Sequence, residues 1–150
     1  MIMRFHHAAI STPDLDRCVA FYKDVVGCQE AWSFDWETGS AEADAMTGLT
    51  DSAARAVMLK LGDSFLEVFE FSSPTPRPGD PNRPVCDHGI THVCLQVDDL
   101  HAEYARMQAA GMRFHSAPLT QDSGYVIYGR DPDGNVVELI EFTEVAPRQA

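Results

Sequence analysis

The sequence lacks the features that mark membrane-spanning and nucleic-acid-binding proteins. No stretch approaches the roughly 20 apolar residues that a bilayer-spanning helix needs, and the start MIMRFHHAAI has no charged segment followed by an apolar run. Basic residues are scarce, since 11 Lys and Arg face 23 Asp and Glu, for a formal net charge of -12. Such a charge repels phosphates and anionic lipids. We therefore expect a cytoplasmic protein that binds neither nucleic acid nor membrane and acts on a small molecule.

Cysteine is also sparse, and its spacing excludes two further classes of protein. The chain of 150 residues has four cysteines, with no CxxC pair and no closely spaced framework. With 45% hydrophobic residues, a chain of this length can bury a core without disulfide bonds. We expect neither disulfides nor a thiolate zinc site, but reduced and partly buried thiols at Cys18, Cys28, Cys86 and Cys94.

An internal repeat divides the chain into two modules. The segment FHHAAISTPDL at 5–15 aligns with ITHVCLQVDDL at 90–100, which places His7 on His92. In each copy a strand leads into a helix, then into a short strand and a hairpin, so the predicted order is β-α-β-β-β, twice. We predict one α+β domain that shares one core, with module one at 1–71, a proline-rich linker at 72–88 and module two at 89–144.

Local signals predict where the two helices begin and end. A helix begins after an N-capping side chain and commonly ends at a glycine. In module one these signals are Thr12 as the cap, Pro13 as the first helical residue and Gly27 at the end. In module two they are Asp98 and Gly111.

The remaining elements are predicted from alternation and turn residues. Short strands are expected at 28–34 and 112–117, and the hairpins turn at residues 62–63 and at DPDGN, 131–135. The segment 36–55, the insert, has no counterpart in module two. Within it a short helix is predicted from Ala41 to Thr47, capped by Ser40 and ended by Gly48.

Two acidic residues stand among apolar ones in the last strand of each module. Because side chains alternate along a strand, Glu67 in FLEVFEF shares a face with three phenylalanines, and Glu138 in VVELIEF shares a face with Val136, Ile140 and Phe142. By the same alternation His7 and His92 lie on these faces, whereas His6 faces the other way. Glu70 and Glu141 fall on the opposite faces, where solvated carboxylates are expected.

The repeated placement of an acid and a histidine predicts a metal site. An ionised carboxylate among apolar groups costs several kcal/mol unless a cation, a proton or hydrogen bonds compensate it. Taken singly, each glutamate is compatible with a salt bridge or protonation, and each histidine with an ordinary hydrogen bond. Two of each at equivalent positions favour a divalent ion, with zinc, nickel, cobalt, manganese or Fe(II) compatible with imidazole and carboxylate ligands.

Four segments resemble a known family. The segments HAAISTPDLDRCVAFYKDVVG, FLEVFEF, GITHVCLQVDD and YGRDPDGNVVELIEF are similar to the vicinal oxygen chelate superfamily, which includes glyoxalase I, methylmalonyl-CoA epimerase, extradiol dioxygenases, fosfomycin-resistance enzymes and bleomycin-binding proteins. The resemblance covers nearly the whole chain apart from the insert and the linker. It implies two βαβββ modules that form an open mixed-sheet barrel around a metal held by His7, Glu67, His92 and Glu138. It also implies a homodimer, because some members build each site from two chains.

The His-Glu-His-Glu set resembles the glyoxalase I and epimerase branch. That likeness implies a metal-dependent lyase or isomerase in which Glu138 or Glu67 transfers a proton next to a metal-bound carbonyl. Where glyoxalase I has an arginine and an asparagine that favour glutathione, this chain has Ser11 and Phe71, so we do not expect a glutathione adduct as substrate. The extra base of the epimerase falls at residues 55–57, which are Arg-Ala-Val here, so two-base racemisation is not expected.

Two other functions stay open. Tyr128 matches the active-site tyrosine of the extradiol dioxygenases, which use Fe(II), but Glu67 would occupy a position that oxygen needs, and His115 is a weak match for their catalytic histidine. A non-catalytic binding protein of the bleomycin-resistance type is the other alternative, although such members generally lack the four ligands.

Aromatic and basic residues near these strands are candidates for substrate binding. Tyr128, Trp32 and Trp36 are predicted to line the pocket, with packing on the sheet as the alternative for each. Arg55 is predicted to meet an anionic group of the substrate, with an exposed surface position as its alternative.

Overall fold

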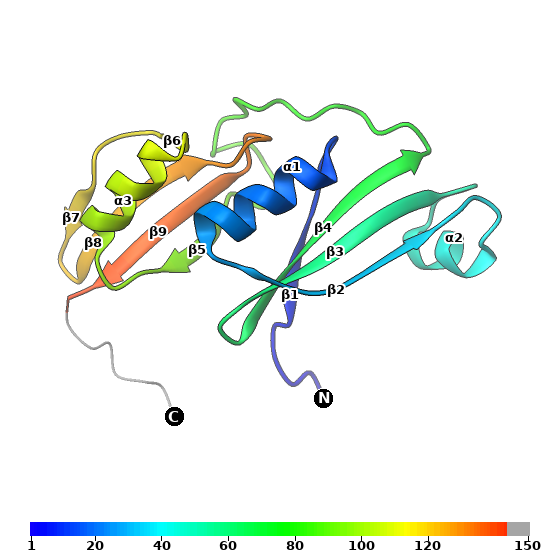
Figure 1. Ribbon diagram of the computed structural model, residues 1–150, viewed down its shortest axis with the longest axis horizontal. Helices are drawn as coiled ribbons and strands as arrows, with labels where there is room; N and C mark the ends of the chain where they lie inside the picture. The colour runs from blue at the N-terminus through cyan, green and yellow to red at the C-terminus, as the bar shows by residue number, and fades with distance from the viewer. Residues whose placement is uncertain (144–150) are drawn as a thin grey trace. The chain divides into compact units, whose positions relative to one another are not determined.

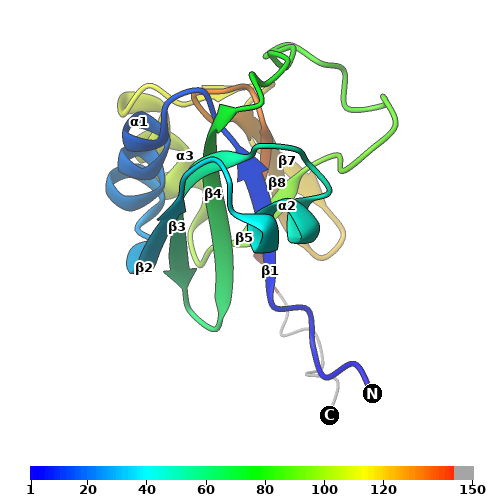
Figure 2. The ribbon, with the colours of Figure 1, turned by 90° about the vertical axis from the view of Figure 1, so that its right-hand side faces the viewer.

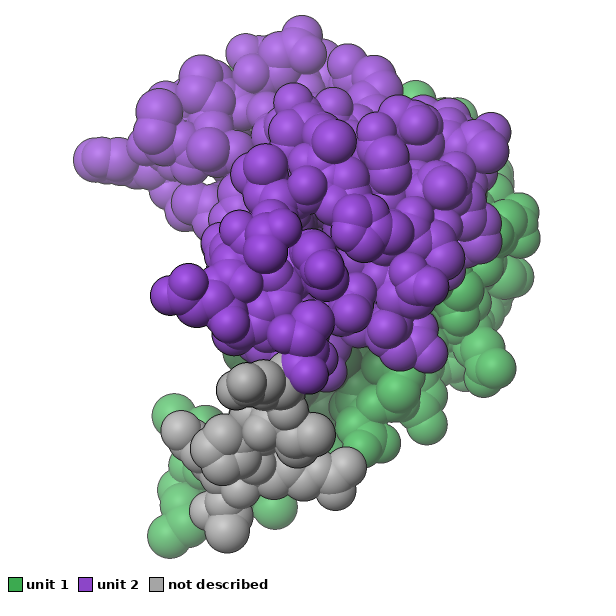
Figure 3. Space-filling model, turned by 90° about the vertical axis from the view of Figure 1, so that its left-hand side faces the viewer, with its two compact units in different colours: residues 1–79 green, residues 80–150 purple. Residues whose placement is uncertain are grey.

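The computed structural model describes residues 1–143, which fall into two compact units. Unit 1 comprises residues 1–79 and unit 2 begins at residue 80 (Figure 3). Each unit contains one mixed sheet and a helix packed on it in the predicted order, and unit 1 also contains the helix of the insert, so the α+β class is confirmed. The predicted end of module two, at residue 144, lies outside the described residues. Among residues 1–143 no helix is long and apolar enough to cross a membrane.

Unit 1 is a four-stranded sheet covered on one face by a helix (Figure 1). Its strands are β1 (His7–Ser11), β4 (Ser64–Ser73), β3 (Ala53–Leu61) and β2 (Gln29–Trp36), in that order across the sheet. The pair β1 and β4 is parallel and the other pairs are antiparallel. The helix begins as α1 (Leu15–Ala20) and continues as a π-helical segment, η1 (Phe21–Val26), that ends at Gly27 as predicted.

The core of unit 1 lies between this helix and the sheet. Cys18 and Tyr22 from the helix pack against Val57, Leu59 and Val68 of the sheet, and all five are buried. Burial of such side chains contributes roughly 1.5–3 kcal/mol each. The helix therefore covers one face of the sheet. Glu67 lies on the opposite face, which the helix does not cover.

The predicted start of the first helix is wrong by two residues. The N-cap is Asp14, whose carboxylate accepts a hydrogen bond from the Arg17 amide at 3.0 Å. The Thr12 hydroxyl accepts from the Asp14 amide instead, at 3.1 Å, and so fixes the turn before the cap. Pro13 consequently precedes the helix, and the first helical residue is Leu15.

The insert folds as predicted. Helix α2 (Ala41–Thr47) is capped by Ser40, whose hydroxyl accepts from the Ala43 amide at 3.2 Å, and it ends at Gly48 in the left-handed conformation (Figure 2). Asp44 then accepts from the amides of Asp51 and Ser52 at 2.9 and 2.8 Å. These bonds tie the insert to the start of β3. Together the Ser52 hydroxyl and the two amides hold the pKa of Asp44 below its usual value.

Unit 2 repeats the plan with shorter strands. Its sheet has the order β5 (Val93–Gln96), β9 (Val136–Phe142), β8 (Gly124–Arg130) and β6 (Arg113–Phe114), and β5 is parallel to β9. Helix α3 (Leu100–Ala109) buries Leu100 and Met107. The strand predicted at 112–117 is only two residues long, and an unpredicted strand, β7 (Leu119–Gln121), pairs with β8.

The cap of the second helix is also displaced. Asp99, rather than Asp98, is the N-cap, and its carboxylate accepts from the Ala102 amide at 2.9 Å. The second half of the linker, residues 80–88, belongs to unit 2. Arg130 of β8 holds this segment, because it donates to the carbonyl of Arg83 at 2.9 Å and to that of Pro81 at 3.4 Å.

Candidate functional site

In unit 1 the sheet brings His7 and Glu67 together. The register of β1 on β4 pairs His7 with Phe65 and Ala9 with Glu67, so the histidine and the acid share the face opposite the helix. The His7 Nε2 atom lies 3.3 Å from Glu67 Oε2, and the glutamate side chain is only 12% exposed. Unit 1 therefore forms one of the predicted ligand pairs.

Unit 2 forms the equivalent pair from His92 and Glu138. Glu138 pairs with Cys94 on β5 and with Tyr128 on β8. His92 precedes β5, and its Nε2 atom lies 3.0 Å from Glu138 Oε2, with the glutamate side chain 15% exposed. The two modules thus place the same two residue types in nearly the same geometry.

The geometry of each pair fits a divalent ion. Zinc bonds to histidine nitrogen and carboxylate oxygen are about 2.0–2.2 Å long, so two adjacent ligands of one ion have donor atoms about 3 Å apart. The observed separations of 3.0 and 3.3 Å match that distance, and both donor types suit such ions. Each pair also lies at ion-pair distance without an ion. Within residues 1–143, no group of three or more His, Cys, Asp and Glu side chains forms a metal site.

The residue that precedes each histidine contacts its Nδ1 atom. The His7 Nδ1 atom lies 2.9 Å from His6 Nδ1, and the His92 Nδ1 atom lies 2.9 Å from the Thr91 hydroxyl oxygen. The prediction that His6 faces away from the site is wrong, because β1 begins only at His7 and strand alternation does not extend to residue 6. The His6 ring instead stacks on Phe65, with ring centroids 4.8 Å apart.

The second acid of each strand holds a helix rather than water. Glu70 Oε2 accepts from the Leu15 amide at 3.0 Å, and Glu141 Oε2 accepts from the Leu100 amide at 2.8 Å. The expectation of solvated carboxylates at Glu70 and Glu141 is therefore wrong, since both satisfy amides at the first turn of a helix. A sequence signal did exist in the shared spacing E-x-x-E, which puts one acid on each face of the strand.

The neighbours of Glu138 are polar. Shielding from water and a hydrogen bond to Glu138 raise the pKa of the Cys94 thiol to about 12. Partial desolvation and the Glu138 carboxylate raise the pKa of Tyr128 as well. The Tyr128 ring also contacts the His92 ring, with centroids 5.0 Å apart. An acid, a thiol, a phenol and an imidazole thus converge on this face of unit 2.

A further histidine extends this polar cluster. His115 contacts the Tyr128 ring with centroids 6.3 Å apart, and Arg130 Nε donates to His115 Nε2 at 3.1 Å. Desolvation and the Arg130 charge lower the pKa of His115, which favours the neutral ring. The His115 Nε2 atom therefore accepts the hydrogen bond from Arg130, and the ring proton lies on Nδ1.

The neighbours of Glu67 are apolar. The register places Ala9 and Met58 beside it, where unit 2 has Cys94 and Tyr128. Aromatic rings extend the face: Trp32 contacts Phe65, and the remaining contacts join Phe34, Trp36, Phe69 and Phe71. Two of the predicted substrate-binding residues therefore lie on the face that carries Glu67.

These two tryptophans differ in exposure and anchoring. The Trp36 indole donates to the Ser52 hydroxyl at 3.0 Å, which fixes the ring at the edge of the insert. Trp32 is 47% exposed, so a large part of its ring is available for contact.

Arg55 lies on the other face of the sheet. Its register partner is Glu70, and its guanidinium donates to Glu70 Oε2 at 2.9 Å and to Asp16 Oδ2 at 3.0 Å. These carboxylates raise the pKa of Arg55. The structure therefore places the predicted substrate-binding arginine beside helix α1, away from Glu67.

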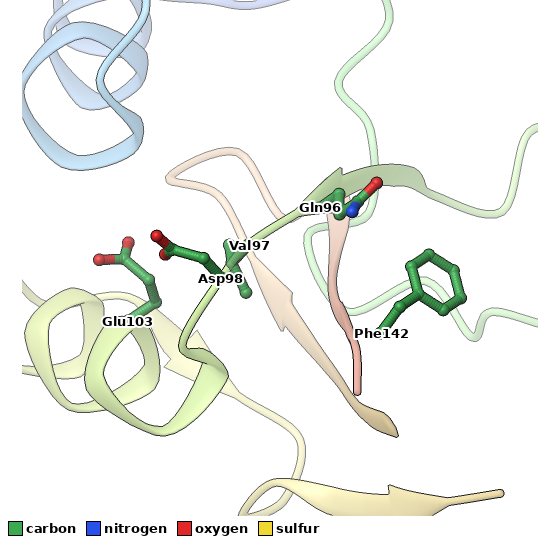
Figure 4. Close-up of a pocket in the computed structure, with 5 residues that line it drawn as sticks. All are labelled: Gln96, Val97, Asp98, Glu103 and Phe142. Carbon is green, nitrogen blue, oxygen red and sulfur yellow. The ribbon is translucent and has the colours of Figure 1, made fainter. Parts of the chain in front are cut away.

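A separate hollow lies at the end of β5 in unit 2. It is open to solvent, has a volume of about 690 Å³, and is lined by Gln96, Val97, Asp98, Glu103 and Phe142 (Figure 4). None of the four predicted ligands is among these lining residues.

Comparisons with known proteins point to one family. A family model described as Glyoxalase/Bleomycin resistance protein/Dioxygenase superfamily matches residues 4–139. A 2-epi-5-epi-valiolone epimerase from an Actinomyces species is 34% identical, with 95% of this chain and 81% of that protein aligned. The mitochondrial methylmalonyl-CoA epimerase of Mus musculus is 27% identical over 91% of this chain and 71% of that protein.

Solved structures share the fold. A glyoxalase family protein from Bacillus cereus superposes with a TM-score of 0.86 at 20% identity, covering 96% of this chain and 97% of that one. A mutant of the fosfomycin resistance protein FosX from Listeria monocytogenes, crystallised with Mn(II) and 1S,2S-dihydroxypropylphosphonic acid, has a TM-score of 0.59 at 17% identity. That match covers 93% of this chain and 90% of the FosX chain.

Proposed function

The chain belongs to the Glyoxalase/Bleomycin resistance protein/Dioxygenase superfamily, and from this premise we propose that it is a divalent-metal-dependent isomerase. The reaction would be proton transfer next to the carbonyl of a small molecule. Isomerase chemistry is favoured over lyase chemistry because two relatives that align over most of this chain are named epimerases.

The observation that carries the proposal is the duplicated His–Glu pair. Each pair has its Nε2 and Oε2 atoms at the separation of two adjacent metal ligands, and each acid is largely buried. We propose that His7, Glu67, His92 and Glu138 hold one divalent ion, supplied within one chain or by two copies in a homodimer. When bound, such an ion polarises a carbonyl oxygen and lowers the energy of the charge that develops there. Manganese is the first ion to test, because the FosX crystal contains it.

Glu138 is the proposed proton carrier. A base next to a carbonyl must take a proton from carbon and return it, and protic neighbours help to keep the acid oriented. Glu138 has the Cys94 thiol and the Tyr128 phenol as its register neighbours on the two adjoining strands. Glu67 has only Ala9 and Met58 at the equivalent register positions. We therefore assign Glu67 mainly as a metal ligand, and as the second candidate for the base.

Tyr128 and Trp32 are the proposed substrate contacts. The phenol of Tyr128 can donate to a substrate oxygen beside Glu138, whereas the exposed Trp32 ring offers an apolar surface beside Phe65. Arg55 is not part of this proposal, because its guanidinium is engaged by Glu70 and Asp16.

The test is hydrogen exchange at carbon. The protein, loaded with Mn²⁺ and then with Zn²⁺ or Ni²⁺, is incubated in D₂O with 2-epi-5-epi-valiolone and, separately, with methylmalonyl-CoA. Solvent deuterium at the carbon next to the carbonyl is measured by mass spectrometry, with metal-free protein and Glu138→Gln as controls. We expect exchange in at least one metal-loaded sample and loss of exchange in both controls. Exchange that is equally fast in the metal-free protein would overturn the metal dependence.

The Tyr128–His115 contact favours one second candidate, an Fe(II)-dependent extradiol dioxygenase. In that case oxygen would be consumed when Fe(II)-loaded protein meets a catechol, and no deuterium would enter the carbonyl substrates. An oxygen electrode therefore distinguishes the two functions.

A further inference from the structure

Each site histidine has a partner at the same place in the sequence. His6 precedes His7 and Thr91 precedes His92, and in both cases the partner atom lies 2.9 Å from Nδ1 while Nε2 faces the glutamate. The two partners are chemically unlike, an imidazole and a hydroxyl, yet they engage the same ring atom. This coincidence in the two modules indicates a shared requirement at Nδ1.

That requirement follows from the chemistry of imidazole as a ligand. A histidine binds a metal through one nitrogen as a neutral ring, so the other nitrogen must keep its proton and needs an acceptor. A hydroxyl oxygen and an unprotonated imidazole nitrogen are both acceptors, and both can donate instead if the ring changes tautomer. Thr91 and His6 can therefore hold the ring in place whether Nε2 faces the glutamate alone or an ion.

The His6 ring is itself held in position. It stacks on Phe65 with an interplanar angle of 5°, and Phe65 is the register partner of His7. This contact fixes the side of His6 that reaches His7. In unit 2, the position of the ring of His92 is further limited by its contact with Tyr128.

We propose that His6 and Thr91 are positioning residues that direct the Nε2 atoms of His7 and His92 to the metal. Their role is to engage Nδ1, so that Nε2 is the only ring nitrogen available to an ion. The inference rests on the metal site of the proposed function, and it adds two residues that themselves touch neither substrate nor ion.

Metal affinity of the full chain tests the role of each residue. Chelator-treated protein is titrated with Mn²⁺ and with Zn²⁺ against a competing indicator dye, for wild type, Thr91→Val and Thr91→Ser. Loss of an outer partner of a metal-bound histidine typically weakens binding by roughly 10- to 100-fold. We expect such a loss for Thr91→Val, which has the same shape without a hydroxyl, and near-normal affinity for Thr91→Ser, which restores it.

The same comparison is made in unit 1. His6→Leu removes the partner nitrogen, whereas His6→Asn keeps a polar group near the place of Nδ1. We expect weakened binding in the first and partial rescue in the second. Unchanged affinity in both Thr91→Val and His6→Leu would overturn the inference, whereas the absence of binding in wild type would overturn the proposed function.

Imidazole NMR tests the contact without any metal. The ¹⁵N resonance of His92 Nδ1 in the metal-free protein should move in Thr91→Val and return in Thr91→Ser, because it reports the hydrogen bond directly. Unchanged resonances in Thr91→Val would overturn the inference even if wild type binds no metal. Circular dichroism of each variant confirms that the sheet is intact.

Discussion

The sheet faces of the two units carry the same pair of residues in different surroundings. In unit 1, Glu67 has Ala9 and Met58 as register neighbours, and aromatic rings extend the face. In unit 2 the corresponding neighbours of Glu138 are Cys94 and Tyr128. Both units thus have a His–Glu pair on the same face of the sheet, but the residues around the pair differ. Under the proposed function, we expect unit 1 to supply an apolar surface and unit 2 the groups that exchange protons.

The largest effect is expected at the acid with the polar neighbours. Glu138→Gln keeps the size of the side chain but cannot accept a proton from carbon, so turnover should fall by at least about 100-fold. The rate of deuterium exchange in metal-loaded protein measures it, and thermal unfolding checks the fold. Glu67→Gln is the matched variant in unit 1. If Glu67→Gln lost more activity than Glu138→Gln, the two roles would have to be exchanged.

The next effect concerns the second acid of each strand. Glu70→Ala and Glu141→Ala leave the first-turn amides of Leu15 and Leu100 without their acceptors, so each should lower the free energy of unfolding by about 1–3 kcal/mol. Glu70 also pairs with Arg55, so Glu70→Ala should have the larger effect. Urea unfolding measures both.

The control for this comparison lies on the other face of the same strands. Glu67→Gln should leave the unfolding free energy of the metal-free protein nearly unchanged, because within residues 1–143 those two helix amides donate to Glu70 and Glu141 and not to Glu67. Equal destabilisation by Glu67→Gln and Glu70→Ala would mean that the two faces are not specialised as described.

A smaller effect is expected on the reactivity of the Cys94 thiol. Cys94 is the register neighbour of Glu138, at the position that Ala9 has beside Glu67. Partial desolvation, the hydrogen bond to Glu138 and the Glu138 charge together raise the pKa of Cys94 to about 12, so the thiol is almost wholly protonated at pH 9. Glu138→Gln removes the charge, and the pKa should fall and the thiolate fraction rise. Alkylation of Cys94 in metal-free protein at pH 9 should therefore be several-fold faster in the variant, as peptide mass spectrometry can measure.

Cys86 and Cys94 are both exposed, so the thiol of Cys86 is the internal standard for that experiment. The alkylation rate of Cys86 should be the same in wild type and in Glu138→Gln. An equal rise at Cys86 and Cys94 would indicate general loosening of unit 2, not a local charge effect.

The smallest effect is expected for Arg55→Ala. The guanidinium contacts Glu70 and Asp16 on the helix side of the sheet, so its loss should lower stability slightly and leave KM for the substrate unchanged. A clear rise in KM, measured with the same exchange assay, would restore Arg55 as a substrate-binding residue.

The sequence predicted the frame of the fold well where local signals agree with the final contacts. The insert helix at Ala41–Thr47 was predictable because Ser40 and Gly48 cap it by contacts within a few residues. The faces of Glu67 and Glu138 were predictable because strand alternation needs only the position of the strand. The first helix cap was misplaced because Asp14, two residues after Thr12, competes for the same role, and only the Asp14 carboxylate reaches the Arg17 amide.

What the sequence could not provide depends on contacts between distant segments. The Glu70 bond to the Leu15 amide spans 55 residues, and the Glu141 bond to the Leu100 amide spans 41. The spacing E-x-x-E places one acid on each face of the strand, but it does not show which helix amide that acid will meet. The position of His6 depended on where β1 begins, and strand ends are set by pairing with β4 rather than by local preference.

The most direct test of the account is the metal stoichiometry of the protein. Equilibrium dialysis of chelator-treated protein against Mn²⁺ or Zn²⁺, followed by metal analysis, gives the number of ions per chain in wild type, Glu67→Ala and His92→Ala. If both pairs hold a single ion, wild type should bind one ion per chain, and each variant should lose most of it although it alters only one unit. Two ions per chain, with one retained in each variant, or no stoichiometric ion in wild type, would contradict the account.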